Sequence, residues 1–200
     1  EQWPPVQIEV RESALVHPLR AEREWPLART RYEPLYLNAA TGALSREPVR
    51  ETTQLAYDPL DEAGEARFDY RFEADTELTG HMKLRLWVEA QGANDMDLFV
   101  AIQKLDSAGA PVGMTFYAFY ENGPVALGWL RASHRALDEE RSTPWQPVHS
   151  HREEALLEPG VPVPVDIEIW PSSTLFRAGE TLRVVVKGMD IYRDALPNLP

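Results

Sequence analysis

The chain has 200 residues, a formal net charge of −12 and no cysteine. The charge disfavours binding to nucleic acid, and the lack of cysteine excludes disulfides, a thiol nucleophile and Cys-ligated zinc. No apolar stretch approaches the roughly 20 residues of a membrane span. We therefore expect one domain over residues 1–200, located in the cytoplasm, without a cofactor and with neither nucleic acid nor a membrane as partner.

The pattern of apolar residues predicts an all-β fold. Seventeen prolines outnumber the 11 glycines and are spread along the chain, which favours short strands and rigid turns over long helices. A long irregular connection is expected from residue 11 to about residue 55, and only 136–141 and 152–157 are compatible with helix. Strands are predicted from apolar patterning at 6–10, 33–38, 66–72, 78–90, 96–106, 114–120, 125–134, 163–169 and 181–188. This spacing is typical of a β-sandwich or jelly roll.

The segment 96–106 differs from the other predicted strands. Its residues are largely apolar at both parities, with Leu98 and Val100 on one face and Phe99 and Ala101 on the other. A strand that is covered on both faces has this pattern. We expect it at the centre of the sheet.

The stretch GWLRASHRALD places Ser133 beside His134, with Asp138 four residues later. A catalytic triad needs the imidazole within hydrogen-bond distance of both the hydroxyl and the carboxylate. Adjacent residues of an extended strand point to opposite faces, and no serine here lies in the G-x-S-x-G elbow of an α/β-hydrolase. The stretch is interpreted as a structural strand, and no catalytic residue is predicted in the chain.

Two segments offer metal-ligand types. His149, His151 and Glu153 would share one face of an extended segment, and two histidines with a carboxylate form a known metal-site composition. Residues 94–97 (NDMD) offer oxygen atoms of the kind that calcium binds. An exposed polar loop and a strand-capping turn are the preferred interpretations, and no metal ligand is predicted.

Aromatic residues at 25–37 are the least explained by strand burial. Trp25, Tyr32 and Tyr36 fit no single period, and they predict a domain interface. An aromatic platform that stacks on sugar rings is the alternative. A domain separated from its neighbour would expose this apolar patch, so self-association into a homo-oligomer is expected of the isolated chain.

Several motifs together resemble one family. They are EWPLARTRYEPLYLN, a YDP turn, ELTGHMKLRLWVEAQGANDMDLFVAIQKLD, GWLRASHRALD, an LEPG turn and LFRAGETLRVVV. In this order they resemble the C-terminal domain of the cocaine esterase and Xaa-Pro dipeptidyl-peptidase family of serine hydrolases, across nearly the whole chain.

The resemblance implies a galactose-binding-like jelly roll that follows an α/β-hydrolase domain with an inserted helical cap. In that architecture the jelly roll is non-catalytic, packs against the hydrolase domain and helps wall its active site. The Ser, Asp and His of the triad lie in the hydrolase domain, so no catalytic residue is carried over. The partners implied are the hydrolase and cap domains of the same polypeptide, which cleaves ester or amide bonds, including acyl esters, Xaa-Pro dipeptides and α-amino-acid esters.

The sequence departs from the family at two places. After the YDP turn a short acidic connection leads into the next predicted strand. It lacks the longer apolar stretch that contributes to the substrate pocket in several members. The family also usually continues past IYRDALPNLP into a further strand, so an open sheet edge is expected there. An independent carbohydrate-binding or adhesion module on the same fold is the competing functional class.

Overall fold

The computed structural model describes residues 3–116 and 120–192, and nearly all of its regular structure is strand. The all-β prediction is confirmed, whereas the jelly-roll topology stays a prediction. The elements are β1 (Val6–Glu9), β2 (Leu19–Glu22), β3 (Tyr36–Asn38), β4 (Ala43–Ser45), β5 (Ala66–Arg71), β6 (Thr76–Val88), β7 (Asp97–Leu105), β8 (Pro111–Val112), β9 (Met114–Phe116), β10 (Tyr120–Gly123), β11 (Ala126–Arg131), the 3₁₀ helix η1 (Ala132–His134), β12 (Val163–Phe176) and β13 (Thr181–Lys187).

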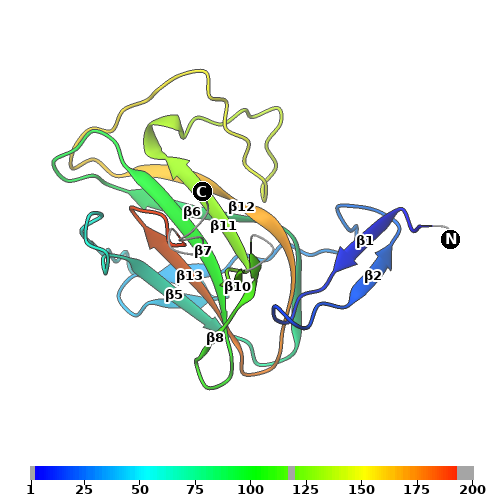
Figure 1. Cartoon of the computed structure of the whole chain (residues 1–200). Helices are drawn as coiled ribbons and strands as arrows, with labels where there is room; N and C mark the ends of the chain where they lie inside the picture. The colour runs from blue at the N-terminus through cyan, green and yellow to red at the C-terminus, as the bar shows by residue number, and fades with distance from the viewer. Residues whose placement is uncertain (1–2, 117–119, 193–200) are drawn as a thin grey trace, which may run out of the picture.

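The largest sheet curls into a sandwich-like body (Figure 1). Its strands follow the order β3-β4-β5-β13-β7-β11-β12-β6, and β8 pairs with β7. All neighbours are antiparallel except β4 and β5, which form a parallel contact between Ala43 and Asp69. Strands β6 and β12 pair along nearly their whole length and curve around the right-hand side of the body in Figure 1.

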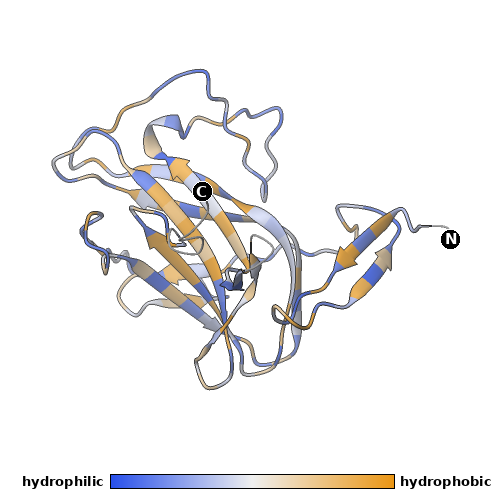
Figure 2. Ribbon diagram, in the orientation of Figure 1, coloured by the Kyte–Doolittle hydropathy of each residue, from blue (hydrophilic) through white to orange (hydrophobic). Residues whose placement is uncertain are grey.

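The core lies inside the curl and is built from alternate residues of the strands. Along β12, Val165, Ile167 and Ile169 are buried, while the residues between them carry polar side chains. Orange and blue segments alternate along the strands in Figure 2, as expected for strands with one buried face.

Strand β7 lies between β13 and β11, which confirms its predicted central position. Its second face is also covered, because Ala101 forms a second buried cluster with Leu127 and Val185, against which Phe116 and Tyr192 pack. Strand β7 has apolar residues on both faces because each face packs into one of these two cores.

Strands β1 and β2 form a separate two-stranded arm that projects from the body on the right of Figure 1. The arm joins the body at Arg11, whose backbone N–H donates to the carbonyl of Ser173 at 3.0 Å and whose carbonyl accepts from the N–H of Leu175 at 2.9 Å. Nearby, the buried Lys104 ammonium donates to the carbonyl of Glu12 at 3.0 Å and lies 2.7 Å from a carboxylate oxygen of Glu180. The N-terminal segment is therefore fixed to the sandwich at residues 11 and 12.

Some expectations from the sequence are corrected. The connection from residue 11 to residue 55 contains strands β2 and β4 besides β3, and the segments 136–141 and 152–157 are irregular rather than helical. Part of the strand predicted at 114–120 and the expected open edge after residue 192 concern residues 117–119 and 193–200, which lie outside the described residues. Within the described part of the chain, no helix is long and apolar enough to span a bilayer.

Candidate functional site

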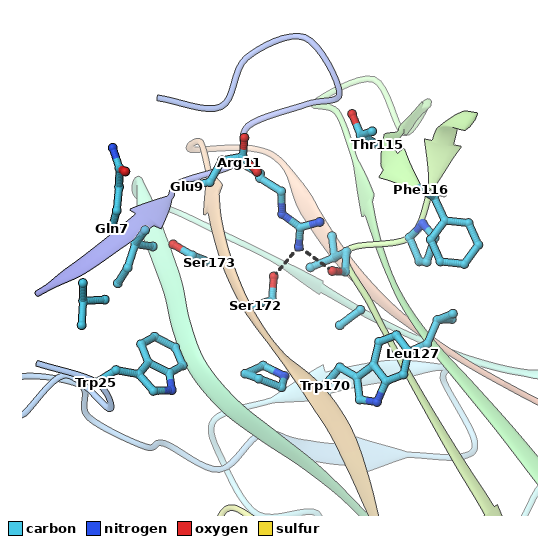
Figure 3. A pocket seen from close by; sticks show the side chains of 16 residues that line it. Gln7, Glu9, Arg11, Trp25, Thr115, Phe116, Leu127, Trp170, Ser172 and Ser173 are labelled. Carbon is cyan, nitrogen blue, oxygen red and sulfur yellow. Dashed lines mark hydrogen bonds between the residues drawn. The ribbon is translucent and has the colours of Figure 1, made fainter. Parts of the chain in front are cut away.

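A groove of about 460 Å³ lies between the arm and the sandwich (Figure 3). Strand β1 and Arg11 form one wall, and the other wall comes from the ends of β9, β11 and the middle of β12. The lining residues are 6–9, Arg11, Trp25, Thr115, Phe116, 124–127 and 170–173.

A break in the β12 pairing shapes the groove. The register with β6 shifts between Ile169 and Ser172, so Trp170 and Pro171 form a bulge. Both residues of the bulge are exposed, and the rings of Trp170 and Trp129 pack in a T-shaped arrangement with centroids 4.8 Å apart. The bulge therefore presents an aromatic surface at the mouth of the groove.

The Arg11 side chain bridges the start of β11 and the middle of β12, a position called here the fork between β11 and β12. One terminal nitrogen, Nη2, donates to the carbonyl of Val125 and to the hydroxyl of Ser172, both at 2.7 Å (Figure 3). Burial lowers the pKa of Arg11, while the charge of Glu9 acts in the opposite direction. The Glu9 carboxylate itself lies 2.7 Å from Nδ1 of His17. The guanidinium is thus held in place by neutral acceptors.

The hydroxyls beside Arg11 are satisfied by one another. Ser172 and Thr174 hydroxyls lie 3.0 Å apart, and the Ser173 hydroxyl lies 2.7 Å from that of Thr79, which donates to Glu77 at 2.6 Å. No general base contacts Ser172 or Ser173 among the described residues. The groove therefore has hydrogen-bonding and apolar surfaces but no activated nucleophile.

The three predicted interface aromatics have different surroundings, and the interface itself stays a prediction. Trp25 is at the groove and 39% exposed, whereas Tyr32 stacks on Trp145 with ring centroids 4.3 Å apart. Tyr36 begins β3, at the opposite edge of the sheet from β6. Sequence reasoning missed Trp170 because its Trp-Pro step interrupts the alternation that would have continued the strand.

Ser133 has a structural environment, and the prediction that residues 125–134 form one strand was wrong at its end. The strand stops at Arg131, and Ser133 is fully buried in η1. Its hydroxyl donates to Oδ2 of Asp95 at 2.7 Å and its backbone N–H to Oδ1 at 2.9 Å. In the part of the chain that the structure describes, no serine hydroxyl hydrogen-bonds to a histidine ring, so a triad is not formed here.

The two candidate metal segments have other contacts. The ring of His151 lies 6.1 Å from those of both His134 and His149, and Nε2 of His149 is 2.9 Å from the carbonyl of Asp166. Burial lowers the pKa of His149. Asp97 forms a two-bond ion pair with Arg131 at 2.8 Å. Over residues 3–116 and 120–192, no group of three or more His, Asp or Glu side chains is arranged to hold a metal ion.

The described residues form a β-sandwich, and the groove holds no serine activated by a general base among them. The family described as the X-Pro dipeptidyl-peptidase C-terminal non-catalytic domain matches residues 1–196. The chain belongs to this family, and the predicted relationship to the cocaine esterase and Xaa-Pro dipeptidyl-peptidase hydrolases is confirmed.

Solved structures agree with this assignment. A CocE/NonD family hydrolase from Staphylococcus aureus superposes with a TM-score of 0.92 and 45% sequence identity, over 94% of this chain and 34% of that chain. An alpha-amino acid ester hydrolase has a TM-score of 0.68 at 16% identity, over 94% and 34% of the two chains. An aminopeptidase from the marine sediment archaeon Thaumarchaeota archaeon has a TM-score of 0.63 at 14% identity, over 94% and 33%.

The last two similarities show the fold alone. The chain spans about a third of the length of these hydrolases. No curated protein matches it.

Proposed function

We propose that the chain is the accessory C-terminal β-sandwich of a serine hydrolase that cleaves ester or amide bonds, as acyl esterases and Xaa-Pro dipeptidyl-peptidases do. The sandwich packs on the α/β-hydrolase domain of the same polypeptide, helps wall its active site and has no turnover of its own. A jelly-roll topology like that of galactose-binding domains and a cytoplasmic location belong to the same proposal.

One observation carries the proposal. Nearly the whole chain, 94%, aligns at 45% identity with 34% of a CocE/NonD family hydrolase, and the family is described as non-catalytic. The buried Ser133 hydroxyl supports it, because a hydroxyl that donates to Asp95 at zero exposure cannot attack a substrate. The independent carbohydrate-binding or adhesion module is not favoured, since the similar solved structures described above are hydrolases.

The test uses a serine-directed fluorophosphonate probe on the full-length protein and on residues 1–200. We expect one labelled serine in the full-length protein, outside residues 1–200 and within a G-x-S-x-G elbow. The separate chain should stay unlabelled while circular dichroism shows it folded. A label on Ser133, or a full-length reading frame without a hydrolase region, would show the proposal to be wrong.

A further inference from the structure

The arm has an open strand edge that faces the groove. Val10 donates its N–H to the carbonyl of Pro18. Because hydrogen-bonded pairs alternate along an antiparallel ladder, the N–H and C=O groups of Val6 and Ile8 also point toward β2. In an antiparallel pair the intervening residues turn theirs the other way. The N–H and C=O groups of Gln7 and Glu9 therefore point away from β2.

These groups point in the same direction as those of Arg11, which do pair with β12. Strand β1 diverges from β12 on the N-terminal side of Arg11, and the groove fills the gap. Among the described residues, no strand pairs with β1 on this side. An unpaired strand edge of this kind is a template for an added strand.

Two aromatic side chains of the groove are suited to pack against side chains of such a strand. Trp25 and Trp170 line the groove, and Trp170 is 55% exposed. Figure 3 shows the two indoles on the same side of the groove, below Arg11 and Ser172. Exposed indoles beside an open backbone edge supply both the apolar contact and the hydrogen bonds that peptide recognition by strand addition uses.

Arg11 adds a charge preference. Among the described residues no carboxylate forms an ion pair with the Arg11 guanidinium, although the charge of Glu9 acts on it. The Glu9 carboxylate contacts His17, and both side-chain hydrogen bonds of Arg11 are donated by Nη2. Arg11 lines the groove, and its Nε and Nη1 atoms donate no hydrogen bond to the described residues. A partly buried guanidinium in this state is complementary to a carboxylate, which forms charge-assisted hydrogen bonds with it.

We propose that the groove between β1 and β12 docks an extended segment of the hydrolase part of the same polypeptide. The segment adds a strand to the open edge at Gln7 and Glu9, packs an apolar side chain against Trp25 and Trp170, and presents an Asp or Glu to Arg11. This inference rests on the proposed function, because it takes its partner from the hydrolase domain.

Two observations favour this occupant over a second copy of the chain. The relatives are about three times as long as the matched region, and in a protein of that length the preceding polypeptide leads directly into β1, one wall of the groove. Attachment to β1 gives the hydrolase part a high effective concentration at the groove. Two copies paired at this groove would bring together two formal net charges of −12, which opposes the self-association that the exposed aromatic residues favour.

The first experiment replaces Trp170 in the full-length protein with the photo-crosslinker p-benzoylphenylalanine and maps the cross-linked peptides by mass spectrometry. The control position is Trp87 on β6, which is 66% exposed and does not line the groove. We expect position 170 to cross-link within one polypeptide to a single segment of the hydrolase part that contains an Asp or Glu. A cross-link between copies overturns the proposal.

The failure of this docking can be told apart from the failure of the proposed function. If position 87 reaches the hydrolase part and position 170 does not, the docking site is wrong and the domain packing stands. If no hydrolase region exists, or if the phosphonate label lies within residues 1–200, the proposed function fails first.

A second experiment tests the backbone pairing with two matched proline variants. Gln7 and Ala21 are opposite each other in the arm, and both turn their N–H out of the ladder, Gln7 toward the groove and Ala21 away from it. In the full-length protein we expect Gln7→Pro to raise hydrogen–deuterium exchange of the docked segment about three- to tenfold, the effect of one lost backbone hydrogen bond. Ala21→Pro should leave the exchange unchanged, and equal effects of the two variants overturn the strand addition.

Discussion

Replacing Ser133 with alanine separates a structural serine from a catalytic one. The substitution removes the 2.7 Å hydrogen bond from the hydroxyl to Oδ2 of Asp95 and keeps the 2.9 Å bond from the backbone N–H to Oδ1. A hydrogen bond to a charged group contributes about 1.5–3 kcal/mol. The Asp95 side chain is 24% exposed, so water can replace part of the loss. We therefore expect a loss of unfolding free energy at the lower end of this range, about 1.5 kcal/mol.

The assay is urea unfolding of residues 1–200, followed by tryptophan fluorescence, together with kcat of the full-length hydrolase. Ser133→Ala should lower the free energy of unfolding by about 1.5 kcal/mol and leave kcat unchanged. The exposed Ser107 is the control, because Ser107→Ala should change neither quantity. Unchanged stability with a kcat loss approaching about 10⁶-fold, as when a nucleophilic serine is removed, would refute the reasoning.

Two further outcomes test ion pairs, one at the attachment of the N-terminal segment and one within that segment. Lys104→Met should lower the free energy of unfolding by about 3 kcal/mol, since it leaves Glu180 without its cation 2.7 Å away; equal stability in urea would contradict this. The hydrogen bond from Arg29, followed by that from Arg20, lowers the pKa of Glu22 from 4.5 to about 2. Because this pKa is depressed in the folded chain, the stabilisation is complete above about pH 4.5 and is lost as the pH falls toward about 2. Protection factors of the β2 amides, measured as the pH is lowered, should show that loss, and Glu22→Gln should reduce their pH dependence, leaving the part due to Glu77, whose pKa the hydrogen bond from Arg20 also lowers.

The sandwich could be predicted because each of its main strands has a local pattern of apolar residues that is typical of a strand. Strand β7 is apolar on both faces because each face packs into a different buried cluster. Its local pattern therefore predicted its position at the centre of the sheet. At Ser133 the same reasoning failed, because extended and 3₁₀ conformations of a short segment do not differ in apolar period. There Ser133 hydrogen-bonds to Asp95, 38 residues away, and a local pattern does not report such a contact.

The groove could not be predicted, because it depends on contacts between distant segments. Arg11 reaches Ser172 and Val125 across separations of 161 and 114 residues. Trp25 was selected for its lack of periodicity, whereas Trp170 was passed over because a bulge, which breaks alternation, resembles a turn in sequence. Tyr32 was selected on the same basis as Trp25, but its ring is covered by Trp145.

The attachment at residues 11 and 12 has a practical consequence for where such a domain can be cut. The arm projects from the body and looks dispensable in outline (Figure 1), so a truncation that starts at β3 would appear to preserve the sandwich. It would remove the guanidinium that fills the fork between β11 and β12 and one carbonyl that receives the Lys104 ammonium. A working boundary for expression therefore lies before β1, because Arg11 and Glu12 belong to the folding unit.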